Sequence, residues 1–240
     1  MKRFYKETAV DLGDGGHRIL LDGKPMRTPA KTVLAVPTRA RAEAIAAEWG
    51  EVPDKADINV SHLPLTRLAA TGHDRVTTQR TRVIEDTAKY AGSDMLCYRA
   101  SEPETLVKRQ RETWQPLLDW AAGRYGARLV VVEGLAFVDQ PADAVARLHE
   151  AVAAHSDLGL SALYNLTHIS GSLVVALAVA EGHLSAADAF AAAQLDELYQ
   201  IERWGEDPIA TKRHAGIRHD IDASARFLAL LAGQRLKGRS

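Results

Sequence analysis

The segment RILLDGKPMRTPAKTVLAV, residues 18–36, decides how the N-terminal part of the chain folds. Its two ends, Arg18–Leu21 and Thr32–Val36, are short runs of apolar and β-prone residues, which is typical of strands. Between them Asp22 and Gly23 form one of the dipeptides that two-residue hairpin turns prefer, since both residues tolerate a positive φ. The segment therefore predicts strands that return on one another in a small antiparallel sheet.

The residues on either side of this segment extend the same pattern. A third β-prone run, Phe4–Val10, comes before it and is followed by the glycine-rich turn LGDGG. After it, Pro37 and Thr38 predict the start of a helix, ARAEAIAAEWGEV, with Trp49 on its apolar face. We therefore expect residues 1–65 to form a small β-rich domain with one packed helix.

From about residue 64 onward, apolar residues recur at helical spacing nearly to the C-terminus. The run LVVV at Leu129–Val132 could form an isolated strand. The predicted helices are Leu65–Tyr90 with a break near Gly72, Glu102–Tyr125, Ala142–His155, Ser161–Ala180, Ala186–Trp204 and Asp220–Leu236. The expected fold class is therefore α+β, with the small β-rich domain followed by a larger all-helical domain at residues 66–240.

Composition excludes several classes of partner. The 240 residues carry 30 basic and 31 acidic side chains, so no net field would draw the chain to nucleic acid or to an anionic membrane. The longest apolar run, Leu173–Ala180, is too short to cross a bilayer, and we expect no membrane insertion. The single cysteine, Cys97, allows no intrachain disulfide, and the N-terminal residues show no apolar run of signal-peptide length. These features favour a cytoplasmic protein.

Motifs of the common enzyme classes are missing. The sequence contains no GxxxxGK[ST], HExxH or GxSxG pattern, so we expect neither a cofactor nor a small-molecule substrate. The densest group of possible metal ligands is TKRHAGIRHDID, with His214, His219, Asp220 and Asp222. This stretch reads as a polar connector before the last helix, and we expect no metal there.

The segment LDELYQIERWGED, Leu195–Asp207, gathers five carboxylates beside an alanine-rich helical run. On a helical wheel its apolar residues form one face, and Trp204 lies at the edge of that face. Asp196, Gln200 and Arg203 fall together on the opposite side, which predicts contact with solvent.

Two carboxylates of this segment, Glu197 and Glu202, fall on or beside the apolar face. Such a carboxylate can pair with an arginine inside the domain, act as a general acid or base, or present an acceptor beside aromatic surface to a protein partner. We prefer the partner contact for Glu197, which lies close to Trp204, and the internal ion pair for Glu202.

Several longer motifs, in order along the chain, carry a family resemblance. They resemble the assembly chaperones of the F1 sector of ATP synthase that handle the alpha subunit. The motifs are RFYK at 3–6, LDGKPMRTP at 21–29, PLTRLAATGHDR at 64–75, DMLCYRA at 94–100, WQPLLDWA at 114–121 and LDELYQIERWGED at 195–207.

The resemblance implies a chaperone and not an enzyme, with an N-terminal β-containing domain and a C-terminal helical domain. Members of this family bind the free alpha subunit until a beta subunit takes its place, and a bacterial member would work in the cytoplasm. The family's important acidic position carries over to Glu197, with Asp196 beside it as the second choice. We expect the F1 alpha subunit as partner, bound through Glu197, Asp196, Gln200 and Trp204.

Two alternatives remain open from the residues themselves. One is a cytoplasmic enzyme that uses Glu197 with His214 or His219 as an acid–base pair; the other is a structural protein whose acidic segment stabilises a helix bundle. The chaperone hypothesis requires Glu197 to be exposed near an apolar patch. The enzyme hypothesis requires it in a cleft near a histidine, and the structural hypothesis requires it buried against an arginine.

Overall fold

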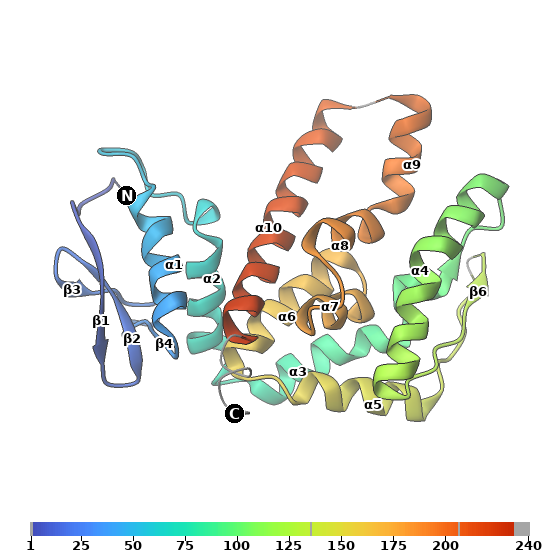
Figure 1. The fold of residues 1–240 in the computed structure, drawn as a ribbon, viewed down its shortest axis with the longest axis horizontal. Coiled ribbons are helices and arrows are strands. Elements are labelled where there is room, and N and C mark those ends of the chain that lie inside the picture. Colours follow the sequence, from blue (N-terminus) through green and yellow to red (C-terminus); the bar gives the residue numbers. More distant parts are fainter. Residues whose placement is uncertain (1, 135, 206, 233–240) are drawn as a thin grey trace. The chain divides into compact units, whose positions relative to one another are not determined.

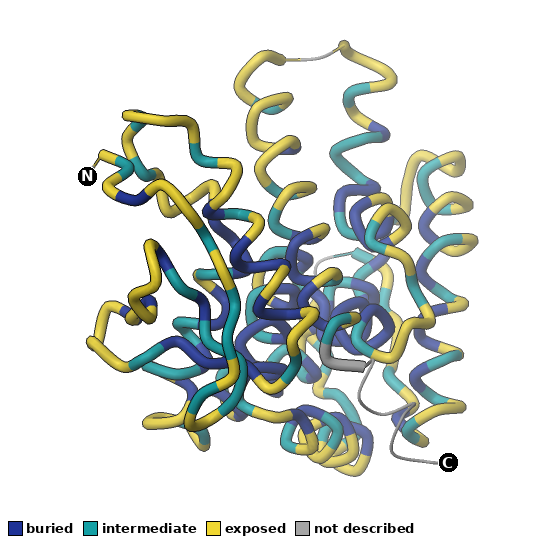
Figure 2. Tube along the Cα trace, turned by 60° about the vertical axis from the view of Figure 1, so that its left-hand side comes forward, coloured by how far each residue is buried: buried dark blue, intermediate teal, exposed yellow. Residues whose placement is uncertain are grey.

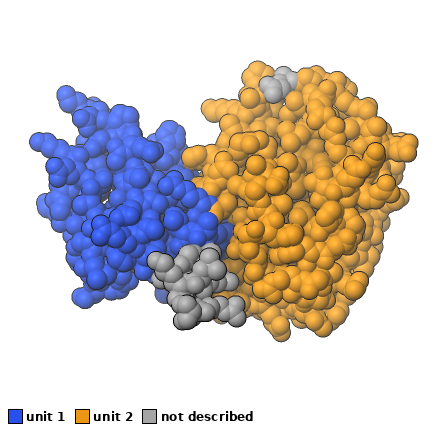
Figure 3. Space-filling model, viewed as in Figure 1, with its two compact units in different colours: residues 1–80, 156–162, 226–240 blue, residues 81–155, 163–225 orange. Residues whose placement is uncertain are grey.

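The computed structural model describes residues 2–134, 136–205 and 207–232, with side chains up to residue 230 (Figure 1). The chain divides into two compact units (Figure 3). Unit 1 is formed by residues 1–80, 156–162 and 226–240, and unit 2 by residues 81–155 and 163–225. These units group residues by contact and not by independent folding, so the domain boundary expected after residue 65 stays a prediction.

Unit 1 contains the expected antiparallel sheet. Its strands are β1 (Thr8–Gly13), β2 (Gly16–Leu21), β3 (Lys24–Pro25) and β4 (Ala35–Val36). Strand β2 pairs with all three others. The turn between β2 and β3 consists of Asp22 at φ 48° and Gly23 at φ 76°, which confirms the predicted two-residue hairpin.

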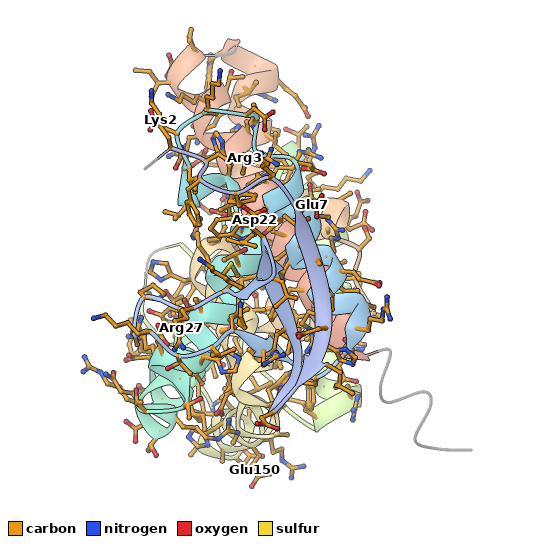
Figure 4. All side chains as sticks on the ribbon, turned by 90° about the vertical axis from the view of Figure 1, so that its left-hand side faces the viewer. Lys2, Arg3, Glu7, Asp22, Arg27 and Glu150 are labelled. Atoms are coloured by element: carbon orange, nitrogen blue, oxygen red, sulfur yellow. The ribbon has the colours of Figure 1, made fainter. Side chains whose placement is uncertain are left out.

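The carboxylate of Asp22 also fixes the chain before β1. It accepts the backbone N–H groups of Lys6 and Glu7, each at 2.9 Å, and Figure 4 labels Glu7 and Asp22 at this end of the sheet. These hydrogen bonds hold the pKa of Asp22 below its usual range. The aspartate of the turn therefore has a second structural use besides its backbone conformation.

Helices pack on the sheet and complete unit 1. Helix α1 (Arg39–Gly50) begins after Thr38, whose side chain accepts the N–H of Arg41, and it packs against β1 and β2. The single-turn helix η1 (Val60–His62) leads into α2 (Pro64–Thr71), which continues as a short π-helix, η2 (Gly72–Val76). This change confirms the predicted break near Gly72. A Cβ atom at Gly72 would lie 2.6 Å from Leu158 Cδ2 and 3.2 Å from Leu158 Cα, so any larger residue would have to displace Leu158.

The remaining helices run from α3 to α10, and α6 and α10 contribute residues to both units. Their bounds are α3 Arg80–Ala88, α4 Glu104–Tyr125, α5 Ala142–Ala153, α6 Asp157–Ser170, α7 Leu173–Ala180, α8 Ala186–Ala193, α9 Leu195–Trp204 and α10 Pro208–Ala232, with the short turns η3 Lys89–Gly92 and η4 Met95–Cys97. Helix α7 is buried from Leu173 to Val179 and packs against α4 and α8, so it forms the core of unit 2 (Figure 2). None of the described helices is long and apolar enough to span a membrane.

Two of the predicted helices are each divided in the structure. The run expected at Ser161–Ala180 breaks at Gly171, whose φ is 69°, and Ser172 then caps α7. The run expected at Ala186–Trp204 breaks at Gln194, between α8 and α9.

The expected α+β class is confirmed, although the helical part also contains a short sheet. Strand β5 (Tyr98–Arg99) pairs in parallel with β6 (Val132–Glu133), at the end of the run that suggested an isolated strand.

Helix α10 begins twelve residues earlier than predicted, at Pro208 and not at Asp220. A proline in the first turn costs no hydrogen bond, because its missing N–H would have no partner there. The carboxylate of Asp207 accepts the N–H groups of Ile209 and Ala210, each at 3.3 Å, and so caps the helix. The sequence signal is Asp-Pro as cap and first residue, and the interpretation of this stretch as a connector is wrong.

Candidate functional site

The acidic segment forms helix α9, which packs against α4 and α8 and is joined to the first half of α10 by hydrogen bonds of Glu197; these elements lie in unit 2 (Figure 1). Leu195 and Tyr199 are the buried residues of α9, as the apolar face of the wheel predicted. The helix ends at Gly205, whose φ of 88° stops helical geometry. The chain then returns as α10, so that side chains of the two helices meet.

Glu197 lies at this meeting of helices. Its Oε2 accepts a hydrogen bond from Arg213 and lies 2.7 Å from Nε2 of His214, both on α10. The Glu197 side chain is 39% exposed and that of His214 only 10%. The ring of His214 meets Phe190 of α8 edge-on, with centroids 6.1 Å apart. The carboxylate is therefore half-buried in an ion-paired cluster that joins α9 to α10.

This geometry contains a feature of each hypothesis. The arginine pair fits the structural role, the nearby histidine is one of the two named for the enzyme, and the exposed part of the carboxylate leaves an acceptor for a partner. The geometry of Glu197 alone does not choose among these roles.

Asp196 is placed differently from the prediction. Its Oδ1 accepts a hydrogen bond of 2.8 Å from Nε2 of Gln110, a buried residue of α4. The same Gln110 uses its Oε1 to accept the N–H of Ala100. The expectation that Asp196 faces solvent is wrong, because α4 covers this side of α9.

Glu202 forms the ion pair that was expected, with Arg109 of α4 at 2.8 Å. The pair is not internal, however, since the glutamate side chain is 56% exposed and the arginine 44%. An exposed pair of this kind contributes about 0–1 kcal/mol. Gln200, another predicted partner-binding residue, is exposed on α9.

The junction of the two helices carries the most exposed large apolar side chains in the described part of the chain. Trp204, at the end of α9, is 78% exposed and Ile209, in the first turn of α10, is 79% exposed. We call residues 204, 205 and 207–209 the α9–α10 tip. Sequence reasoning identified Trp204 but missed Ile209, because α10 was expected to start later.

The histidines and the cysteine show no reactive arrangement. His214 is engaged with Glu197, and across residues 2–134, 136–205 and 207–230 no three His, Cys, Asp or Glu side chains gather as metal ligands. Cys97 is fully buried, and burial raises the pKa of its thiol to about 12. Its thiolate is therefore inaccessible at neutral pH.

Comparison with known proteins adds independent information. The family model of the ATP12 chaperone protein matches residues 2–122. The crystal structure of Atp12 from Paracoccus denitrificans is 39% identical, with a TM-score of 0.88 over 95% of this chain and 97% of that one. A crystal structure from Agrobacterium tumefaciens is 42% identical, with a TM-score of 0.91 over 96% and 86% of the two chains. Mitochondrial atp12 of Schizosaccharomyces pombe is 25% identical over 215 residues, which cover 85% of this chain and 74% of the yeast protein.

These matches exclude the enzyme hypothesis, because the family is non-enzymatic. The role of Glu197 within the chaperone stays a prediction. The resemblance found in the sequence motifs is confirmed by both the family model and the solved structures. The chain belongs to the ATP12 chaperone family and is an assembly factor for the F1 sector of ATP synthase.

Proposed function

We propose that this chaperone holds the free F1 alpha subunit through the outer side of α9 and the α9–α10 tip. The observation that supports this surface is the exposure of Trp204 and Ile209, at 78% and 79%. Tryptophan is among the residue types that most often dominate the energy of protein contacts. Trp204 and the apolar side chain of Ile209, at the same helix junction, can insert into an apolar part of a client.

The physical need for such a surface follows from subunit assembly. A subunit whose interface partner is missing exposes apolar area, and exposed area of that kind promotes aggregation. A chaperone that covers it must bind with moderate affinity, because an excessively tight complex would not exchange for the beta subunit. A small apolar contact with a charged rim fits that requirement, since the charges contribute more to orientation and discrimination than to affinity.

The polar residues of α9 have distinct parts in this proposal. Glu197 joins α9 to α10 through Arg213 and His214 and keeps 39% of its side chain exposed to the client. Gln200 is exposed on the same helix and offers both a donor and an acceptor. Asp196 acts indirectly, because its bond to Gln110 sets the position of α9 on α4.

We place this activity in the bacterial cytoplasm. The support is the similarity to the proteins from Paracoccus denitrificans and Agrobacterium tumefaciens, at 39% and 42% identity.

The proposal is tested by co-expressing the chain with the F1 alpha subunit and measuring soluble alpha. Replacing Trp204 and Ile209 together by serine is expected to lower soluble alpha by about fivefold or more, since each lost anchor costs about 1 kcal/mol or more. The thermal midpoint of the chaperone should stay close to that of wild type, because both side chains are already exposed.

The matched control is Phe137→Ser, which removes another exposed aromatic residue of unit 2, 68% exposed, outside the tip. If wild type neither binds alpha nor raises its soluble yield, the choice of client is wrong. If the tip variant behaves like the control, the client is bound elsewhere.

A further inference from the structure

Unit 1 contains a pocket of about 610 Å³, and none of its lining residues belongs to the α9–α10 tip. From its shape and charge we propose that it binds an extended segment of a protein partner, with an apolar residue between two acidic residues. The choice of a protein as ligand rests on the chaperone function; the pocket itself is separate from the proposed alpha-binding surface. Its apolar lining comes from Met26, Leu34, Trp49, Val60, Leu63 and Ala70.

The walls of the pocket are held by hydrogen bonds within unit 1. On one side the indole N–H of Trp49 donates to Thr66 Oγ1 at 3.0 Å. The carboxylate of Glu48 accepts the N–H groups of Leu65 at 2.6 Å and Thr66 at 2.9 Å. These bonds fix α1 against the start of α2, so this wall is formed before any ligand binds.

The loop after β3 supplies another part of the lining. Asp74 of η2 holds it, because one carboxylate oxygen accepts the hydroxyl of Thr28 at 2.7 Å and the other accepts the N–H of Ala30 at 3.0 Å. A site whose lining segments are held in this way loses little conformational entropy on binding.

The interior of the pocket suits an apolar side chain. Among its lining residues Met26, Leu34 and Leu63 are buried, whereas Val60 is 63% exposed. Its volume lies in the range of ligand pockets, about 300–1,000 Å³. An apolar group that enters would cover surface that is now in contact with water.

The charges around the pocket select for acidic neighbours of that apolar group. Arg27, Arg67 and Arg75 line the pocket and are exposed, and Figure 4 labels Arg27 on the loop side. Asp74 is the acidic residue in the lining, and both of its oxygens already accept hydrogen bonds from the loop. The lining therefore holds three cationic side chains and one anionic side chain, which favours a ligand with carboxylates.

The spacing of two arginines indicates how the carboxylates are arranged. Arg67 on α2 and Arg75 on η2 are eight residues apart, so at the α-helical rise of 1.5 Å per residue their spacing along the helix is at most about 12 Å. Two carboxylates held about this far apart could each meet one of the two arginines. In an extended chain, residues i and i+4 lie about 13 Å apart and share a face with residue i+2. The ligand class is therefore acidic–x–apolar–x–acidic in extended conformation.

The test is a titration of the full-length, ¹⁵N-labelled chain with the synthetic peptide GSETLTESG, followed by amide and indole NMR signals. We expect saturable shifts at the Trp49 indole N–H and at backbone amides that line the pocket. Arg67→Glu and Arg75→Glu should each weaken binding by about fivefold or more, because each places a carboxylate opposite a peptide carboxylate. Arg67→Gln and Arg75→Gln keep a polar side chain without a charge, and each should weaken peptide binding less than the glutamate variant at the same position.

The controls separate this inference from its alternatives. Arg39→Glu reverses an exposed arginine of unit 1 outside the pocket and should bind the peptide like wild type. The peptides GSKTLTKSG and GSETSTESG, which lack the acids or the apolar residue, should bind more weakly.

The inference is overturned if the peptide produces no shifts at the pocket, if the Arg67 and Arg75 variants bind like Arg39→Glu, or if dodecanoate binds there and the peptide does not. Because no alpha subunit is present in the titration, failure here leaves the tip proposal standing, and failure of the co-expression test leaves this one standing.

Discussion

At the scale of single residues, Asp94 gives the clearest dependence of stability on pH. This fully buried carboxyl accepts the N–H of Leu96 at 3.1 Å and that of Val174 at 3.0 Å, and so ties η4 to the first turn of α7. Burial raises its pKa from 3.8 to about 6, although its hydrogen bonds oppose the rise. The folded state therefore binds the proton more tightly than the unfolded chain does. The stability contributed by Asp94 is complete below about pH 4 and is lost as pH rises through about 6.

We predict that Asp94 contributes on the order of 3 kcal/mol to this fall in stability. The measurement is urea unfolding of wild type and Asp94→Asn at several pH values between about 4 and 7. The asparagine side chain is always neutral, and its NH₂ group must face one of the two N–H donors, so the variant is less stable throughout. The difference from wild type should shrink as pH rises, and a constant difference would contradict the assignment.

Arg41 is a second buried charge, and here we predict that removal stabilises the protein. Its side chain is 0% exposed and lies 5.4 Å from the ring centroid of Phe227, and among the described residues none of its guanidinium nitrogens has a hydrogen-bond partner. Burial lowers its pKa to about 10. Arg41→Met fills much of the same space without a charge and should raise the free energy of unfolding by about 1 kcal/mol or more. A loss of stability in the same urea assay would show that Arg41 is paired in solution.

At the scale of elements, a substitution at the α9–α10 junction should weaken binding of the alpha subunit more than it lowers the stability of the chaperone. Glu197→Lys places a cation against Arg213 and His214, so it should disturb the position of the tip. We expect binding of the alpha subunit to weaken by about tenfold, while stability falls by only about 1 kcal/mol because the original pair is partly exposed. Glu181→Lys, which reverses the partner of Arg124 in unit 2 outside α9, is the matched control. Equal losses of binding and stability in Glu197→Lys would make this residue structural.

The ends and faces of the elements show what local sequence patterns predict and what they omit. The turn at Asp22 and Gly23 was predictable because local conformational preference alone determines it. The break at Gly171 was missed because apolar spacing continues through it, and the contacts that define it come from Ser172 and from Asp94, distant in sequence. The wheel likewise gave the buried residues of α9 but placed Asp196 in solvent, since a wheel contains no information about the neighbouring α4.

At the scale of the whole molecule, the fold class and the family were accessible from sequence, whereas the unit 1 pocket was not. The motif LDGKPMRTP supplied part of the resemblance, but the pocket also needs Trp49, Val60 and the arginines of α2 and η2. Residues this far apart in sequence are brought together only by the packing of α1, α2 and the loop after β3. Charge and shape of a pocket are therefore properties of the folded unit and not of any one motif.

The two proposed surfaces belong to different units, which makes their energetic relation measurable. If both contact the same alpha chain at separate places, the changes in binding free energy for Trp204→Ser and Arg67→Glu should add within about 0.5 kcal/mol in the double variant. Titration of alpha against wild type, both single variants and the double variant completes this double-mutant cycle.

A double variant that binds no worse than Trp204→Ser would mean that the pocket contacts alpha only after the tip has engaged. If Arg67→Glu leaves alpha binding unchanged while abolishing peptide binding, the pocket serves a second protein partner. The cycle thus assigns each surface to a client without requiring either unit to fold alone.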